Sequence, residues 1–526
     1  MSGSTPPIHA LTRRDFLAGS AALIGSASLA RPRALAASGP EGGAVRNVIL
    51  IVSDTLRRDA LGCYGSTWVK TPHLDKFSGK SVVLDQAYVS SFPTVPCRND
   101  VLTGRYTFTY KPWAPIDPDA VTLQETLARA GIRTALIADT RHPFAGEMNY
   151  QRGFEATHLI RGQEGEKFKS EPAEPKFPCD VNKLRSGPRV VTNYLRNVHD
   201  RRGEEDYFVA QTMRAAADWL RGRKTHDPFF LYVDTFDPHE PWDPPRQYVD
   251  RYDPGYTGQE VIYPRYDRWR DFLTEAELKH CRALYAAEVS LVDRWIGHLI
   301  ETVETLGLLG DTLVIVASDH GFLLGEHGFI GKLCIRDSGR QSLPLYPEIS
   351  RIPMILSYPG GRPGTRLNLL AQPVNLMPTI LEFLGVPIPD QVQSPSLTAA
   401  LQGRADPAAV RIVVSSPTLS HARLRTPDPA DRSSICDGRW MLVYGAQTDR
   451  VGRRRQTTTV PADESPPTPE LYDLDADPAC GRNLYAARYE VARGLHVSYV
   501  GLLEKCRMNE THLRFFRKLP DPAAKE

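Results

Sequence analysis

The sequence lacks three features that would assign it to familiar classes. Its 64 basic and 62 acidic residues are spread over 526 positions without a block of one sign, so nucleic acid is not an expected partner. The eight cysteines show no C-x-x-C spacing, which excludes a zinc ribbon and a thioredoxin-like site and leaves disulfide pairing open. The sequence has no internal repeats, which excludes a solenoid.

The N-terminal residues have the pattern of an export signal. Arg13 and Arg14 precede a weakly apolar run over residues 17–30, and Ala34 and Ala36 frame a small-residue cleavage site. This order predicts a twin-arginine signal peptide over residues 1–36, the export machinery as a partner, and a periplasmic or secreted mature protein. The apolar run is shorter than the roughly 20 residues that span a membrane, so no stable membrane anchor is expected. An ordinary N-terminal helix is the alternative.

Four short apolar runs predict buried strands of a largely parallel sheet. The runs cover residues 48–52, 134–137, 229–233 and 313–316, and each is followed within three residues by an aspartate. These aspartates are Asp54, Asp139, Asp234 and Asp319. Helical patterns between the runs, at 123–130 and 283–306, fit crossover connections. Ligands of open α/β sheets bind outside the carboxyl ends of the strands, so the aspartates are expected at one edge.

The residue composition of the sequence changes near residue 404. A Pro- and Arg-rich stretch is followed by short strand patterns at 440–444 and 471–474 and by a helical pattern at 490–504. The length is sufficient for more than one structural unit. We therefore predict an α/β catalytic domain over 45–403 and a C-terminal subdomain with a short antiparallel sheet over 404–526.

Two of the predicted strand ends carry residues that bind divalent cations. Asp54 follows the first strand, and Asp319 and His320 follow the fourth. Two carboxylates and an imidazole supply the donor atoms of a metal site. Taken alone, each aspartate could equally be a helix N-cap or a solvated loop residue instead of a metal ligand.

The segment between these strand ends carries the most specific motif. Residues 92–106 read F-P-T-V-P-C-R-N-D-V-L-T-G-R-Y. This segment resembles the nucleophile segment of the sulfatase branch of the alkaline-phosphatase superfamily, C-x-P-S-R-x-x-x-L-T-G-R. The resemblance covers about residues 46–485 and implies an α/β/α sandwich and a metal-dependent hydrolase of sulfate or phosphate esters. Its other matching segments, in order, are 237–241, 351–353, 359–361, 377–381, 471–474 and 477–478.

The chain departs from this family at the nucleophile. Thr94 stands where sulfatases have the cysteine that is oxidised to formylglycine, while Arg98 keeps its place. Cys97 is not a convincing precursor of formylglycine. A motif centred on Cys97 would need Pro or Ala at position 99 and Arg at position 101, but the sequence has Asn99 and Val101. Threonine cannot re-form an aldehyde to expel sulfate, whereas a phospho-threonine can be resolved by in-line attack of water. The residue type therefore favours phosphorus over sulfur.

The resemblance also implies a metal shell of Asp54, Thr94, Asp319 and His320. Thr55 stands where many sulfatases have a second aspartate, and this thins the carboxylate shell that calcium prefers. One divalent ion is expected, with Mn²⁺ or Zn²⁺ favoured and Ca²⁺ or Mg²⁺ as alternatives. A second metal would draw on Asp237, His239 and His327.

The remaining roles are carried over from the family motifs. Arg98 would pair with the charge that develops on the nucleophile, Lys332 would face the substrate, and His239 would protonate the leaving oxygen. The expected substrate-binding residues are Asp139, Arg141, His142 and His327. The first three depart from the G-K-W-H that sulfatases commonly have after the second predicted strand, and they imply a different substrate group.

The favoured function is hydrolysis of a phosphoester, with a diester as the favoured substrate and Thr94 as the nucleophile that forms a covalent phospho-threonine. One alternative is a sulfuric ester hydrolase with the same metal site, in which Thr94 is a scaffold and water attacks. Another is a catalytically silent binding protein. The expected substrate is a small-molecule or glycan-linked phosphate or sulfate ester. The pocket walls are expected from residues 161–190, 240–275 and 333–350.

Overall fold

The computed structural model describes residues 44–144, 147–336, 339–404, 410–419, 426–448 and 468–523. These described residues all belong to one compact unit. The predicted export signal, residues 1–36, lies outside the described residues, and the subdivision at residue 404 stays a prediction. No described helix combines the length and the apolar character needed to cross a bilayer.

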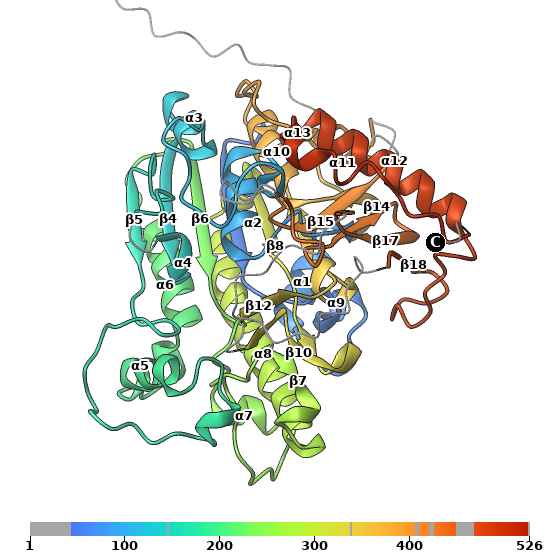
Figure 1. The fold of residues 1–526 in the computed structure, drawn as a ribbon. Helices are drawn as coiled ribbons and strands as arrows, with labels where there is room; N and C mark the ends of the chain where they lie inside the picture. The colour runs from blue at the N-terminus through green and yellow to red at the C-terminus, as the bar shows by residue number, and fades with distance from the viewer. Residues whose placement is uncertain are drawn as a thin grey trace, which may run out of the picture. The chain divides into compact units, whose positions relative to one another are not determined.

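The central element is an eight-stranded sheet with the order β14-β2-β13-β8-β1-β6-β4-β5 (Figure 1). Neighbouring strands are parallel except at β13, which is antiparallel to β8 and β2. The four predicted strands are confirmed as β1, β4, β6 and β8. The strands are β1 Asn47–Ser53, β2 Val82–Ala87, β4 Arg133–Ala138, β5 Ala156–Leu159, β6 Phe229–Thr235, β8 Thr312–Ser318, β13 Met354–Ser357 and β14 Thr365–Ala371.

Alternate residues of β1 point into two different apolar cores. Ile49 and Ile51 belong to the core that includes α1, α6 and α8, whereas Val48 and Leu50 belong to the core that includes α2, α3 and α10. Helices therefore cover both faces of the sheet, as the period of two along a buried strand requires. The helices are α1 Pro72–Ser78, α2 Thr94–Thr103, α3 Leu123–Arg129, α6 Phe208–Arg221, α8 Glu275–Thr305 and α10 Leu376–Phe383.

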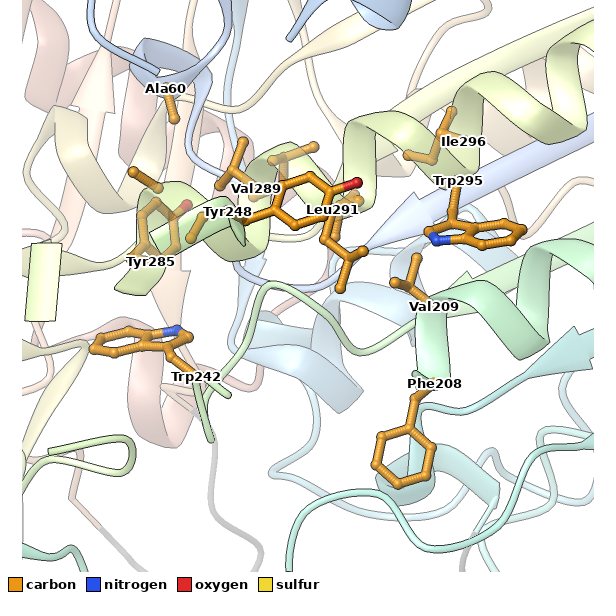
Figure 2. Packing of buried hydrophobic residues seen from close by; sticks show 14 of the residues in the cluster. Ala60, Phe208, Val209, Trp242, Tyr248, Tyr285, Val289, Leu291, Trp295 and Ile296 are labelled. Carbon is orange, nitrogen blue, oxygen red and sulfur yellow. The ribbon is translucent and has the colours of Figure 1, made fainter. Parts of the chain in front are cut away.

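The long helix α8 organises the first of these cores. Figure 2 shows Tyr285, Val289 and Trp295 of α8 in the same cluster as Phe208 of α6. Trp242, which follows β6, packs edge-on against Tyr285 with ring centroids 5.8 Å apart. This contact holds the segment that carries His239 against the helix.

A second, five-stranded sheet has the order β18-β17-β16-β15-β3. Its strands are antiparallel except for β15 and β3, which run parallel. The predicted C-terminal strands and helix are confirmed, and β3 adds a strand from the segment that leads directly to Thr94. The elements are β3 Ser91–Phe92, β15 Val413–Pro417, β16 Ser433–Cys436, β17 Trp440–Tyr444, β18 Glu470–Asp473 and α12 Tyr489–Lys505.

Shorter elements connect these layers. They include α4 Arg141–Phe144, α5 Pro188–Val198, α7 Arg246–Val249, α9 Pro347–Ser350, α11 Thr398–Leu401 and α13 Glu510–Leu513. Two small sheets pair β7 Asp267–Arg268 and β9 Leu323–Leu324 with β10 Phe329–Gly331, and β11 Leu333–Arg336 with β12 Gly339–Ser342.

Candidate active site

Three of the predicted aspartates meet at the carboxyl ends of β6, β1 and β8. The central strand β1 pairs with both neighbours, so that Ser53 lies opposite Thr235 on one side and Ser318 on the other. Asp54 and Asp319 directly follow their strands, and Asp234 lies at the end of β6. All three carboxylates are buried. The parallel register thus concentrates negative charge at one point.

Asp54, Asp319 and His320 form a group with the geometry of a metal site. One donor atom from each residue lies within 4.8 Å of the others. Nδ1 of His320 is 3.0 Å from the carbonyl oxygen of Gly321, so the proton on Nδ1 is donated there and Nε2 remains a ligand. Burial and the Lys332 ammonium hold the pKa of His320 well below its usual value, which keeps the imidazole neutral.

A buried carboxylate oxygen that accepts no hydrogen bond supports the fit of a divalent cation to this group. Oδ2 of Asp54 is buried and has no hydrogen-bond partner among the described residues. Burial and the neighbouring charge of Asp319 raise the pKa of Asp54 despite the attraction of Arg98 and Lys332, so a further positive charge would stabilise this carboxylate. The donor set of two carboxylates and an imidazole suits Mn²⁺ or Zn²⁺. Asp54, Asp319 and His320 would hold the ion.

Thr55 orients two of these ligands. Its hydroxyl donates to Oδ1 of Asp54 at 2.7 Å, and its backbone amide donates to Oδ1 of Asp319 at 3.0 Å. The residue has a φ of 62°, in the left-handed region that β-branched residues rarely adopt. Thr55 therefore supplies hydrogen bonds at the position where many sulfatases have a second aspartate.

The Arg98 guanidinium lies among the three aspartates. Nε and Nη2 each donate to Asp234 at 2.9 Å, and Nη1 donates to Asp319 and lies 3.2 Å from Oδ2 of Asp54. The three carboxylates raise the pKa of Arg98 against the opposing effect of burial. Arg98 is thus held by the ligand carboxylates, and its predicted contact with the nucleophile's developing charge stays a prediction.

Thr94 is the first residue of α2 and lies at the base of a pocket. Its side chain is buried, yet its hydroxyl makes no hydrogen bond to any residue that the structure describes. The carbonyl oxygen of Thr94 accepts a hydrogen bond from Nη1 of Arg98 at 3.2 Å. By contrast, the neighbouring Cys97 belongs to the apolar core behind the helix, and burial raises the pKa of its thiol well above the usual value.

Lys332 and His239 complete the base of the pocket, and both are buried. Nζ of Lys332 is 3.1 Å from Nε2 of His320, which links the pocket to the metal group. Burial lowers the pKa of Lys332 despite the attraction of Asp54 and Glu240. Burial and the charge of Lys332 likewise hold the pKa of His239 well below its usual value, so its imidazole is neutral before an anion binds.

Glu240 fixes the orientation of His239. Nδ1 of His239 donates to the backbone oxygen of Glu240 at 2.7 Å and lies 3.3 Å from the Glu240 carboxylate. Arg185 and Tyr266 hold the other carboxylate oxygen at 2.7 and 2.5 Å. With Nδ1 occupied, Nε2 of His239 is the nitrogen available for proton transfer.

The pocket has a volume of about 1370 Å³ and receives residues from all three predicted wall segments. Residues 161–190 contribute Glu164 and Arg189 among others, residues 240–275 contribute Tyr263, and residues 333–350 contribute Arg340. The prediction of these walls is confirmed. Trp113 also lines the pocket and is 42% exposed.

The four predicted substrate-binding residues occupy different environments. Arg141 and His142 line the pocket, and His142 contacts Glu164 at 3.2 Å. Asp139 also lines it, but its carboxylate accepts hydrogen bonds from Thr212 and from the backbone of the segment after β6. His327 is not among the pocket-lining residues and instead stacks on a tyrosine, Tyr346, with ring centroids 3.9 Å apart. Their binding roles stay predictions.

Four residues of the site were not predicted as functional. Asp234 was recognised only as a strand-end aspartate, although it lies in the same pattern as Asp54 and Asp319. Glu240 stands beside His239 in the D-P-H-E-P segment, which was a usable signal. Glu164 and Arg185 lie in an insertion whose composition gives no hint of their pairing at 3.0 Å.

The chain is similar to known proteins in both sequence and fold. A family model described as Sulfatase matches residues 46–386. An arylsulfatase of Clostridium perfringens is 24% identical over 403 residues, covering 68% of this chain and 79% of that protein. The α/β fold with a largely parallel sheet and a small antiparallel C-terminal sheet, predicted from the sequence, is confirmed in solved structures.

Two solved structures share the fold at low identity. A phosphonate monoester hydrolase of Agrobacterium radiobacter has a TM-score of 0.66 and 20% identity, covering 88% of this chain and 96% of that one. A structure described as a complex with its substrate D-glucosamine-2-N,6-O-disulfate has a TM-score of 0.66 and 19% identity, covering 89% and 99%.

Proposed function

The chain belongs to the sulfatase family, and we propose that its pocket hydrolyses a sulfuric ester at a divalent metal held by Asp54, Asp319 and His320. One observation carries the proposal. Lys332 lines the pocket, and its Nζ lies 3.1 Å from Nε2 of His320 in the candidate metal group. The arylsulfatase relative supports sulfur as the element that is attacked.

The pocket residues supply binding and proton transfer for this reaction. A bound cation would draw negative charge from the ester oxygens and favour attack at sulfur. Lys332 binds the anionic head, whose charge raises the pKa of the adjacent His239. As its pKa rises, His239 takes up a proton from solvent on Nε2 and donates it to the leaving oxygen while the bond from sulfur to that oxygen breaks and the bond from water to sulfur forms. The attacking water releases its two protons to solvent. The ester and water give an alcohol, sulfate and one proton.

Thr94 favours a second candidate, hydrolysis of a phosphorus ester. Its hydroxyl lies at the pocket base without a hydrogen-bond partner among the described residues, where a nucleophile would be free to attack. The oxygen of Thr94 would displace one alcohol from phosphorus while the hydroxyl proton passes to that alcohol. Water would then release phosphate from the phospho-threonine of a monoester, or a phosphomonoester where the substrate is a diester. The phosphonate monoester hydrolase of similar fold is compatible with this candidate, although it shows only the fold.

Site-directed variants at position 94 separate the two candidates. Wild-type protein, Thr94→Ala and Thr94→Ser are loaded with Mn²⁺ or Zn²⁺ and assayed with 4-nitrophenyl sulfate, 4-nitrophenyl phosphate and bis(4-nitrophenyl) phosphate. Sulfuric ester hydrolysis predicts preferred turnover of the sulfate, which persists in Thr94→Ala because water attacks. The phosphorus candidate predicts preferred turnover of a phosphate ester, its loss in Thr94→Ala, and a phosphate on Thr94 in the mass spectrum.

A third outcome would contradict both candidates. If the folded, metal-loaded wild type turned over none of the esters, the chain would act as a binding protein. Asp54→Asn serves as the matched control for metal dependence, because it removes one ligand charge and leaves Thr94 in place. The proposal also includes a single Mn²⁺ or Zn²⁺ ion, and export by the twin-arginine machinery to the periplasm or beyond.

A further inference from the structure

The acidic side chains that line the pocket are mostly neutralised within the protein. Glu164 is held by Arg185 at 3.0 Å and by Tyr263 at 2.7 Å, and Glu166 is paired with Arg161. Asp139 accepts hydrogen bonds from Thr212 and from the backbone. Asp431 accepts a hydrogen bond from Ser342, so Asp428 is the one lining carboxylate that no described side chain holds. The lining carboxylates therefore offset little of any further positive charge on the pocket wall.

Four basic side chains of the same pocket are not neutralised. Arg141, Lys167, Arg189 and Arg340 all line the pocket, and none forms an ion pair or a side-chain hydrogen bond with any residue that the structure describes. They come from separate parts of the chain, namely α4, the loop after β5, α5 and β12. A cavity that gathers unpaired cations from four segments concentrates positive potential inside it.

The positive charge of these four side chains is additional to the charge that binds the reacting ester group. On the proposed function, the buried Lys332 and His239 of this pocket already serve the ester group that reacts. Arg189 and Arg340 belong to residues 161–190 and 333–350, segments that build the walls. Guanidinium groups bind planar or tetrahedral oxyanions through paired hydrogen bonds, so these walls suit an oxyanion other than the one that reacts.

We propose that the pocket takes an ester whose leaving group carries a second oxyanion, and that Arg141, Lys167, Arg189 and Arg340 form the subsite that binds it. This inference rests on the proposed function, because it treats the pocket as a substrate site. The second group can be a sulfate, a phosphate or a carboxylate, since all three present oxygens to guanidinium donors. Neutral leaving groups would leave the subsite empty.

Equilibrium binding tests the subsite without requiring turnover. Naphthalene-2,6-disulfonate and naphthalene-2-sulfonate are titrated into wild-type protein and into the Arg189→Gln/Arg340→Gln double variant. We expect the disulfonate to bind wild type about tenfold more tightly than the monosulfonate, and the double variant to lose that preference. The preference should also weaken as salt rises from 50 to 200 mM, because the subsite is exposed to solvent.

Arg161→Gln is the matched control, because Arg161 lines the same pocket but is already paired with Glu166. It should retain the preference for the disulfonate. Equal affinity of wild type for the two ligands would overturn the inference, as would an equal loss for both ligands in the double variant. Absence of ester turnover would instead contradict the proposed function and leave the binding result to decide the subsite.

Discussion

Arg98 and Asp234 form a bidentate ion pair beneath the candidate metal group, with both N–O distances 2.9 Å. Neither side chain is exposed to solvent to more than 1%. The pair matters because the third nitrogen of Arg98 lies between Asp54 and Asp319. Asp234 thereby sets the position of the cation that balances the two ligand carboxylates.

Replacing Asp234 by asparagine should destabilise the protein strongly. The change leaves the Arg98 guanidinium buried with one fewer counter-charge, and breaking a buried pair on one side costs about 3–5 kcal/mol. The free energy of unfolding, measured by urea denaturation, should fall by that amount. Metal affinity should fall as well, because Arg98 would compete more strongly for Asp54 and Asp319.

A surface pair of the same type provides the control. Asp200 lies 2.7 Å from Lys169, and 56% of its side chain is exposed. Asp200→Asn should change the free energy of unfolding by less than about 1 kcal/mol. A loss of similar size in both variants would contradict the structural role assigned to Asp234.

Removal of metal should lower both activity and thermal stability. The two buried carboxylates then keep Arg98 but lose the positive charge of an ion that binds only the folded state, so the melting temperature should fall after dialysis against a chelator. Addition of Mn²⁺ or Zn²⁺ should restore the melting temperature at one ion per chain. Elemental analysis of wild type, Asp319→Asn and His327→Gln tests the stoichiometry. Asp319→Asn should lose the metal, and His327→Gln should retain it. Two tightly bound ions per wild-type chain would contradict a single metal site.

Thr55 is expected to control which metal is preferred. Thr55→Asp would add a third carboxylate and move the preference toward Ca²⁺, which takes six to eight oxygen ligands. Thr55→Asn is the matched control, because asparagine tolerates the left-handed backbone and carries no charge. The control should gain up to about 1 kcal/mol in unfolding free energy through relief of strain. Only the aspartate variant should show a larger rise in melting temperature with Ca²⁺ than with Mn²⁺.

The sequence predicted the parts of the site that depend on regular structure. Continuous apolar runs ended in Asp54 and Asp319, and the parallel register of β1 with β8 brings these ends together. Thr94 was located by its place in a motif, and α2 begins at that residue. In each case a local pattern determines the position of the side chain.

The pairing of distant loops could not be predicted in this way. Arg185 reaches Glu240 across 55 positions of sequence, and its guanidinium lies 4.2 Å from the ring centroids of both Tyr263 and Tyr266. No periodicity links such residues, because an insertion takes its conformation from contacts with the whole wall of the pocket. The ion pair between Arg98 and Asp234 was not predicted for a related reason, since Asp234 was read only as the end of a strand.

Two buried carboxyl groups should give stability changes of opposite sign as the pH falls. Burial disfavours the charged form of Glu164, but His142, Arg185 and Tyr263 outweigh that effect and hold its pKa far below the ordinary 4.5. Its stabilisation is complete above pH 4.5 and is lost as the pH falls further. Burial raises the pKa of Asp293 to about 7, so the folded state binds this proton more tightly than the unfolded state does.

The variants Glu164→Gln and Asp293→Asn separate these effects. The difference in unfolding free energy between wild type and Glu164→Gln should be largest at neutral pH and shrink below pH 4.5. The difference between wild type and Asp293→Asn should instead shift in favour of wild type between pH 7 and 3.8, because protonation removes the burial penalty of the carboxylate. Urea denaturation at pH 7, 5.5, 4.5 and 3.5 measures both. Parallel pH dependence in the two variants would contradict the environments that the structure gives these carboxyl groups.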